Sequence, residues 1–352
     1  MGLRIRLACL VLIGLILPFR AFSSDQDLET GKKLHDAGDY DGAIRIYRQV
    51  LKDEPKNEIA RYELGFSLYS KGEYRKSIRV LEKLLEDNPE FNPLPYSTLG
   101  SAYDGLTKLG DGEKVLREGL DHFSDSSLLH YNLGINLSLQ NRTDEATREF
   151  IADLRLKPDH SSAWLALAEF QFTQHERHRA FLLFARFLAL ESDTKRAKSA
   201  ASRLWALLFL GVSRRPELNK EGKAQIDVTV PPPNPDGTDP QGARDLGMSM
   251  VAATRFTEEE KGLSDAEFFT TKFPSVLDIL VEQAESKDPD GFWQTLVLNF
   301  FSDAKDADVI NTMAYLSRKP LGESGVTQWL ESHAAEVEKY RQWASSWKPP
   351  AN

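Results

Sequence analysis

Residues 62–89 read YELGFSLYSKGEYRKSIRVLEKLLEDNP, and this stretch decides the fold. Two runs with apolar residues at helical spacing flank a Gly-Glu-Tyr break, and the stretch ends at Pro89. Apolar residues three and four positions apart predict amphipathic helices, and Gly72 between the runs predicts the end of the first helix. The stretch therefore predicts a helical hairpin.

The landmarks of this hairpin return along the chain. A small residue recurs at intervals of 34, 35, 34 and 34 residues: Gly31, Gly65, Gly100, Gly134 and Ala168. A second small residue follows twelve positions later in four places: Ala43, Ser77, Ala146 and Ala180. A proline stands near the end of three units: Pro55, Pro89 and Pro158. Three classes of landmark in one register predict a tandem repeat.

This pattern resembles the tetratricopeptide repeat (TPR) family, whose unit is about 34 residues of helix–turn–helix. The resemblance covers Ser24 to about Thr194 as five units. It implies an all-α fold, a right-handed helix-turn-helix solenoid in which the small residues let paired helices approach closely. The third unit departs from the pattern, because Gly105 interrupts its first helix, and we expect its helix pair to be bent or lengthened. The fifth unit has His175 in place of the turn glycine.

The chain changes character after the fifth unit. Lys195–Val212 reads as an amphipathic helix that caps the solenoid through Ala200, Leu204, Leu207 and Leu208, or else belongs to the next domain. We therefore predict a solenoid over residues 24–213, a Pro/Gly-rich linker over residues 214–242 with a short strand at Ala224–Val230, and a smaller α-helical domain over residues 243–352. This last part resembles no family that we recognise.

Six helices are expected in the C-terminal part: Ala243–Arg255, Asp265–Phe269, Val276–Ser286, Gly291–Phe301, Asp306–Ser317 and Val326–Ser346. Ser264 with Glu267, and Ser275 with Asp278, have the spacing of capping pairs that open a helix. The part either forms a bundle of its own or packs back on the solenoid.

The first 23 residues are typical of an export signal. Met1–Arg6 is basic, the 12 residues Leu7–Pro18 are apolar, and small residues precede a predicted cleavage after Ser23. The apolar run is shorter than the roughly 20 residues that span a bilayer. We expect a periplasmic or secreted protein that contacts a membrane only if this segment stays uncleaved.

Composition excludes several classes of function. The formal net charge is −9, and it becomes −12 without the first 23 residues, which disfavours nucleic acid as a partner. Cys9, within the signal, is the only cysteine, so the mature chain has no thiol. The stretch His175-Glu176-Arg177-His178 has histidines three apart, whereas the metalloprotease motif needs four. We find no catalytic constellation, no metal site and no site for a cofactor.

The resemblance implies a concave groove lined by the first helix of each unit. Carried onto this chain, the apolar and aromatic groove positions are Ile59, Tyr62, Phe66, Tyr69, Leu128, Tyr131, Ile135, Leu139, Leu165 and Phe172. Only Lys32 matches the basic set of family members that clamp a terminal carboxylate. An extended or helical peptide with apolar anchors fits this lining better, unless the chain's own C-terminal half fills the groove.

An aromatic stripe runs along the last expected helix: Trp329, Tyr340, Trp343 and Trp347. Such a stripe usually packs in a core, and the alternative is an exposed docking face. Three functions follow. We expect an exported TPR adaptor that binds a protein or peptide partner and serves cell-envelope assembly or maintenance. The alternatives are an enzyme with an unrecognised catalytic C-terminal domain, and a structural protein that forms homo-oligomers.

Overall fold

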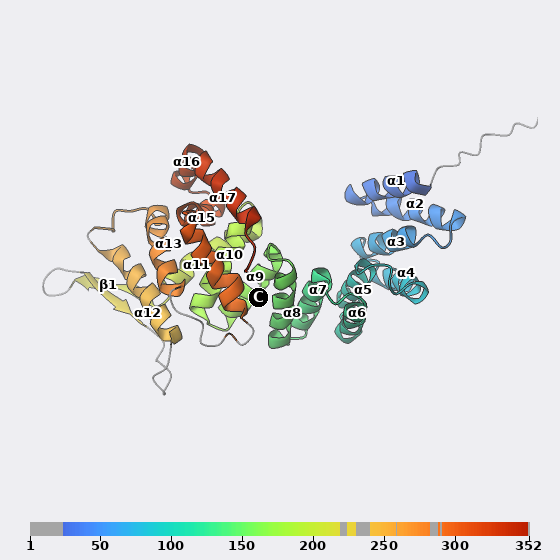
Figure 1. Ribbon diagram of the computed structural model, residues 1–352, viewed down its shortest axis with the longest axis horizontal. Helices are drawn as coiled ribbons and strands as arrows, with labels where there is room; N and C mark the ends of the chain where they lie inside the picture. The colour runs from blue at the N-terminus through green and yellow to red at the C-terminus, as the bar shows by residue number, and fades with distance from the viewer. Residues whose placement is uncertain are drawn as a thin grey trace, which may run out of the picture. The chain divides into compact units, whose positions relative to one another are not determined.

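The computed structural model describes residues 24–218, 224–229, 240–257, 259–281, 288 and 291–350, and these are almost entirely helical (Figure 1). The helices of the repeat region are α1 Ser24–Asp36, α2 Tyr40–Asp53, α3 Glu58–Ser70, α4 Tyr74–Asp87, α5 Leu94–Gly105, α6 Leu109–His122, α7 Ser127–Leu139, α8 Thr143–Leu156, α9 Ser161–Thr173, α10 Arg177–Leu190 and α11 Lys195–Leu208. The predicted all-α helix-turn-helix fold is confirmed. The predicted signal peptide lies outside the described residues.

An antiparallel hairpin and six further α-helices follow the repeats. The hairpin pairs β1 Val212–Leu218 with β2 Ala224–Val228, inside the segment expected to be a linker. The remaining elements are α12 Pro240–Ala253, η1 Thr254–Phe256, α13 Asp265–Val281, η2 Trp293–Leu298, α14 Asn299–Asp306, α15 Ile310–Arg318, η3 Lys319–Leu321, α16 Ser324–Ser332 and α17 Ala334–Ser346. No helix in the described part of the chain is both long and apolar enough to cross a membrane.

The chain divides into two compact units, Met1–Lys108 and Leu109–Asn352. The division falls in the turn between α5 and α6, inside the third repeat. The C-terminal helices belong to the same unit as α6–α11, whereas the sequence placed the main boundary between residues 213 and 243.

Three of the small residues of the repeat, Gly31, Gly65 and Gly134, face a large side chain from the second helix of the pair. A Cβ atom on Gly31 would lie 2.6 Å from the Tyr47 ring, and one on Gly134 would lie 2.7 Å from the Phe150 ring. Gly65 meets Leu81 in the same way, at 2.5 Å. Tyr47, Leu81 and Phe150 are all fully buried. The 34-residue register is therefore a packing requirement, because each glycine makes room for one core side chain.

The turn inside each helix pair also repeats. Each has one residue with a left-handed backbone, and these residues are again 34, 35, 34 and 34 positions apart: Gly38, Gly72, Thr107, Asn141 and His175. In the second repeat the Glu73 amide donates to the Leu68 carbonyl at 2.8 Å, and each of the four remaining repeats has the equivalent bond. This is the Schellman arrangement that ends a helix.

The third unit was expected to be bent or lengthened, and its helices are not lengthened. α5 and α6 have 12 and 14 residues, close to the lengths in the other units. Gly105 ends α5, and a Cβ atom there would lie 2.8 Å from the ring of Tyr74. Thr107 supplies the left-handed turn residue, with φ 58°.

The C-terminal helices agree with the prediction at one feature and differ from it at two. The pair Ser264–Glu267 does cap a helix, because the Ser264 amide donates to the Glu267 carboxylate at 2.8 Å. That helix, α13, continues through Pro274, so the predicted second start at Ser275 is wrong. The expected last helix is two helices, α16 and α17, because the backbone leaves the helical conformation at His333.

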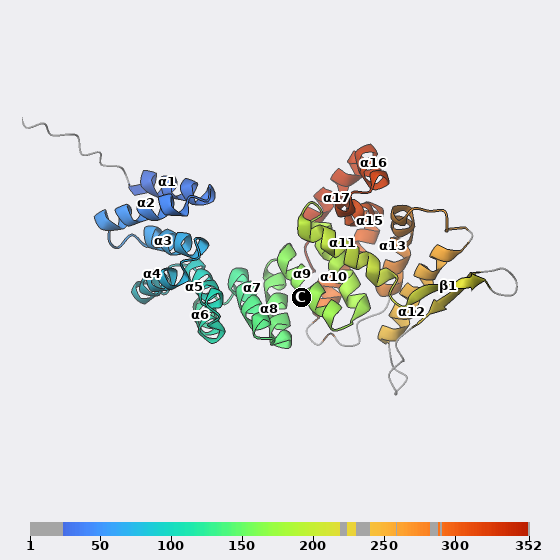
Figure 2. The same ribbon diagram turned by 180° about the vertical axis from the view of Figure 1, so that it is seen from behind.

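The last repeat is enclosed by helices from both sides. α9 and α11 pack on α10, and both views show these three helices side by side (Figures 1 and 2). From the C-terminal half, α12, α15 and η2 also pack on α10. α11 buries Ala200, Leu204, Leu207 and Leu208, as predicted for a covering helix. The C-terminal half therefore packs on the second helix of the fifth unit.

Arg177 links the last repeat to the helices around it. Its Nε donates to the Leu207 carbonyl at 2.8 Å and its Nη2 to the Leu208 carbonyl at 2.9 Å, at the end of α11. Its Nη1 donates to Ser249 Oγ at 2.7 Å and to the Asp245 carbonyl at 2.9 Å on α12. One buried guanidinium thus satisfies acceptors on α11 and α12 together.

Candidate partner-binding surfaces

The predicted groove residues fall into both compact units, and we describe them as two surfaces. The first surface lies in the unit Met1–Lys108 and comprises Ile59, Tyr62, Phe66 and Tyr69 of α3. The second surface lies in the unit Leu109–Asn352 and comprises Leu128, Tyr131, Ile135 and Leu139 of α7 with Leu165 and Phe172 of α9.

The first surface contains a stack of three rings. His35 of α1 stacks on Phe66 with ring centroids 4.5 Å apart, and Phe66 lies parallel to Tyr62 at 6.0 Å. His35 is held by a hydrogen bond of 2.8 Å between its Nδ1 and Ser67 Oγ. Burial lowers the pKa of His35, with Asp36 opposing the shift. The stack is therefore neutral and apolar near pH 7.

Tyr62 is not on an open face. The sequence placed it in the groove, but the structure buries it, with its side chain near Thr98 of α5. Burial raises the pKa of Tyr62 to about 12. Tyr69 is half-buried near Ser101 of α5, and its ring is tilted against that of Tyr74 with ring centroids 5.7 Å apart. These tyrosines connect one repeat to the next.

In the compact unit Met1–Lys108, two aliphatic side chains are exposed to solvent. Ile59 in the first turn of α3 is 53% exposed, and Leu94 in the first turn of α5 is 42% exposed. They are 35 positions apart, so they hold the same place in consecutive repeats, and α3 packs on α5.

The second surface has an exposed aliphatic end and a polar edge. Leu139 in the last turn of α7 is 53% exposed, and Leu128 and Ile135 on the same helix are half-buried. Phe172 and Leu165 on α9 are half-buried as well. The Arg203 guanidinium lies 5.2 Å from the centroid of the Phe172 ring and pairs with Glu169.

Two histidine–carboxylate pairs lie beside Tyr131. His160 lies 4.5 Å from the Tyr131 ring centroid, and its Nδ1 is 2.6 Å from the buried Asp153 carboxylate. The neighbouring His130 has its Nδ1 2.7 Å from Glu149, and this hydrogen bond raises the pKa of His130. Tyr131 therefore packs among polar partners at one end of the surface.

The sequence left open that the C-terminal half fills the groove, but this half does not cover the residues of the second surface. Among the described elements, those after residue 212 pack chiefly on α10 and α11, whereas α7 and the outer side of α9 keep half-buried and exposed apolar side chains. The inner side of α9 does meet this half, where Trp164 stacks on Phe292 at 5.9 Å.

The repeat region matches a family model described as tetratricopeptide repeat over residues 34–99. Residues 34–99 therefore match the tetratricopeptide repeat. Solved structures of TPR proteins resemble it at low identity. A thermophilic TPR protein of Thermus thermophilus is 21% identical and covers 53% of this chain and 99% of its own, with a TM-score of 0.46. The structure of pilF of Pseudomonas aeruginosa is 18% identical and covers 52% of this chain and 83% of its own, with a TM-score of 0.48.

A third solved structure, YrrB, is described as a TPR protein with an unusual peptide-binding site. It is 18% identical and covers 51% of this chain and 92% of its own, with a TM-score of 0.39. No curated protein matches the chain. Tetratricopeptide repeats are a scaffold for protein interaction, and repeats of this type are generally non-catalytic.

The aromatic residues after the TPR region mostly pack inside the fold. Tyr340 is buried and donates from its hydroxyl to the Ala189 carbonyl of α10 at 2.6 Å. Trp343 and Trp347 each lie 5.1 Å from the Phe300 ring centroid. Trp329 lies on a different helix and stacks on Tyr315 at 3.9 Å. The four residues do not form one stripe, because the chain changes direction at His333.

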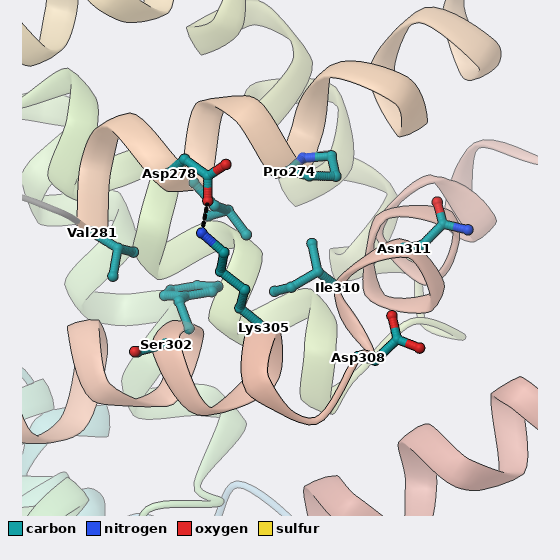
Figure 3. A pocket seen from close by; sticks show the side chains of 10 residues that line it. Pro274, Asp278, Val281, Ser302, Lys305, Asp308, Ile310 and Asn311 are labelled. Atoms are coloured by element: carbon teal, nitrogen blue, oxygen red, sulfur yellow. Dashed lines mark hydrogen bonds and ion pairs between the residues drawn. The ribbon is translucent and has the colours of Figure 1, made fainter.

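The C-terminal helices also enclose a cavity of about 410 Å³ between α13, α14 and α15 (Figure 3). Lys305 reaches across its mouth to Asp278, with Nζ 2.6 Å from Oδ1. The inner wall is apolar and includes Leu277, Phe301 and Ile310. The lining residues include Ser302 and Asp308 but no histidine, so they do not form a nucleophile with a base.

The histidines of the sequence His175–His178 do not face a common site. His175 is an exposed turn residue, and His178 is buried in α10, where its Nδ1 lies 3.7 Å from Asp245. Within the described residues, no group of three or more potential His, Cys, Asp or Glu ligands is placed to hold a metal ion.

Proposed function

We propose that this protein is an exported scaffold of the cell envelope that holds a protein partner by an apolar segment lying across the first helices of the repeats within one of its two compact units. The observation that carries the proposal is the position of the open aliphatic side chains. Among the described repeats, those more than about a third exposed are Ile59, Leu94, Leu139 and Leu156, and three of the four lie on first helices.

Apolar contact favours a partner segment with aliphatic or aromatic anchors. Burying one large aliphatic side chain stabilises a complex by about 1.5–3 kcal/mol. The half-buried Phe66, Ile135 and Phe172 add surface around these exposed residues. A helix or an extended chain with apolar residues at regular spacing meets this surface best.

The test replaces exposed or half-buried apolar residues of the first helices. Ile59→Ser with Leu94→Ser changes the first surface, and Ile135→Ser with Leu139→Ser changes the second. Leu156→Ser is the matched control, because Leu156 is 45% exposed but lies at the end of the second helix α8. Tagged protein is used to capture partners from the envelope of the native host.

We expect at least one surface pair to lose a partner that wild type and Leu156→Ser both capture, with about tenfold weaker binding. Equal capture by all variants would remove the surfaces as the binding site. Export is tested separately by mass spectrometry of the protein from the host. A mature chain that begins at Ser24 supports export, and an intact amino terminus in the cytoplasmic fraction contradicts it.

A further inference from the structure

A second cavity, of about 850 Å³, lies in the unit Leu109–Asn352. It forms where the α8–α9 turn, the end of α10 and the end of α17 meet. Its ionisable lining is strongly basic, with five cations and one acid: Arg155, Lys157, Arg186, Arg341, Lys348 and Asp159. The chain as a whole has a net charge of −9, so this lining runs against the general charge of the protein.

Arg186 supplies a buried charge at this cavity. Its side chain is 1% exposed, and Nη2 donates to the Pro158 carbonyl at 3.4 Å. Nε and Nη1 are buried and have no hydrogen-bond partner. Among the described residues, no carboxylate lies within ion-pair distance of this guanidinium. Buried charges in proteins are normally paired, whereas this guanidinium is attracted by Asp159 only from beyond ion-pair distance.

Aromatic rings offset only part of this cost. The guanidinium lies 3.7 Å from the centroid of the Phe300 ring and 5.4 Å from those of Trp164 and Trp347. Such contacts favour a cation, but they leave the hydrogen-bonding capacity of Nε and Nη1 unused. Burial also lowers the pKa of Arg186 to about 10, so the group remains charged near neutral pH.

The other cations lie on the open side of the cavity. Lys157, Arg341 and Lys348 are exposed, and Trp347 lines the same space as an apolar wall. Tyr340 also lines it, but its hydroxyl is already bonded to the Ala189 carbonyl. A ligand would therefore meet lysines at the mouth, an indole at the wall and a guanidinium at the buried end.

We propose that this cavity binds a small organic anion, whose carboxylate or phosphate group is drawn to Arg186, Lys157 and Lys348 and whose apolar body lies against Trp347. Both oxyanions match the fork of a guanidinium, and the size of the cavity suits a small molecule. The site is separate from the two partner-binding surfaces and does not depend on the function proposed for them.

The test titrates the full-length mature protein with phenylacetate, phenyl phosphate and inorganic phosphate, with the neutral benzyl alcohol as a fourth probe. Binding is measured by calorimetry and by tryptophan fluorescence. We expect saturable binding of phenylacetate or phenyl phosphate, at least tenfold tighter than that of benzyl alcohol. The tighter of the two identifies the head group, and raising the salt concentration to 0.5 M should weaken its binding about fivefold.

Variants assign the binding to this cavity. Lys157→Gln with Lys348→Gln should weaken binding about tenfold, and Arg186→Lys should weaken it while keeping the buried charge. Lys198→Gln, an exposed lysine of α11, is the control and should bind like wild type. Trp347→Phe should abolish the fluorescence change. Absence of saturable binding, equal binding of benzyl alcohol, or unchanged binding by the double lysine variant would each overturn the proposal.

Discussion

Two histidines show how the surroundings of a single residue decide its response to pH. His35 stacks on Phe66 in the first unit, where burial lowers its pKa. His130, in the compact unit Leu109–Asn352, forms hydrogen bonds with the Glu149 carboxylate and the Ser124 carbonyl. The bond to Glu149 is the main reason that its pKa is raised. The neutral form is therefore favoured at His35 and the protonated form at His130.

The two residues should have opposite effects on stability. His130 contributes stability that is fully present below its unfolded pKa of about 6.5 and is lost as the pH rises through its higher folded pKa. His35 contributes stability that is present above the unfolded value and is lost as the pH falls through its lower folded pKa. Acidification from pH 8 should thus strengthen the surroundings of His130 and weaken those of His35.

NMR titration of the histidine ring protons checks this prediction. The midpoint of His130 should lie above 6.5 and that of His35 below it. Glu149→Gln should lower the His130 midpoint and leave the His35 midpoint in place. Equal midpoints in the wild-type chain would show that the Glu149 bond and the ring stack do not control these groups.

At the scale of single elements, the turns reveal which part of the repeat is fixed by backbone geometry. All five turns use a left-handed residue, but only Gly38 and Gly72 are glycines. A non-glycine residue in this conformation costs roughly 1–2 kcal/mol, and a β-branched residue such as Thr107 is the least suited to it. The repeated Schellman bonds hold the turn in shape whichever side chain it has.

Thr107→Gly should therefore stabilise the protein by about 0.5–1 kcal/mol, because it removes strain in the folded state that exceeds the added freedom of the unfolded chain. Gly72→Ala should destabilise it by about 1 kcal/mol for the converse reason. Urea unfolding measures both, and a Thr107→Gly variant that is less stable than wild type would contradict the account. The side-chain bond of 2.6 Å from Thr107 Oγ1 to the Leu106 carbonyl reduces the expected gain.

The same comparison explains what the sequence could predict. The glycine register was readable because Gly31, Gly65 and Gly134 each make room for one core side chain, so their spacing reflects packing. The left-handed turn at Thr107 could not be predicted from the residue type, since its geometry depends on backbone hydrogen bonds. The continuation of α13 through Pro274 depends on tertiary packing, which overrides local preference.

The candidate surfaces were predictable only in part. Leu139 and Ile59 are open, as groove positions should be, and family resemblance alone placed them. Tyr62 fills a space beside Thr98 of the next repeat, and a single repeat contains no information about that neighbour. The cavity at Arg186 escaped prediction because its residues come from α8, α10 and α17, far apart in sequence.

At the scale of the whole molecule, one helix decides how the repeats end. The sequence of α10, RHRAFLLFARFLAL, is apolar on nearly every side, and most of its residues are buried. A helix with this composition needs cover all round, unlike α4 with its polar outer face. This signal for docking of the C-terminal half was present in the sequence and was missed there.

Phe181 can be used to test whether α10 is covered by the C-terminal half or only by the repeats. It is fully buried on α10, and its ring centroid lies 6.0 Å from that of Phe273 on α13. In the full chain, Phe181→Lys buries an unpaired ammonium and removes an aromatic side chain, which should cost about 3–5 kcal/mol. In a fragment of residues 24–213, which lacks α13, the same position should face water.

The fragment of residues 24–213 should therefore expose the outer side of α10, bind a hydrophobic dye and self-associate. Phe181→Lys should reduce both dye binding and association of the fragment, although it destabilises the full chain. Ultracentrifugation and dye fluorescence measure the fragment, and urea unfolding measures the full chain. A loss of stability in the fragment as large as that in the full chain would show that Phe181 packs mainly within the repeats. If Phe181→Lys destabilises the full chain but reduces dye binding and association of the fragment, the C-terminal half is what covers α10 in the full chain.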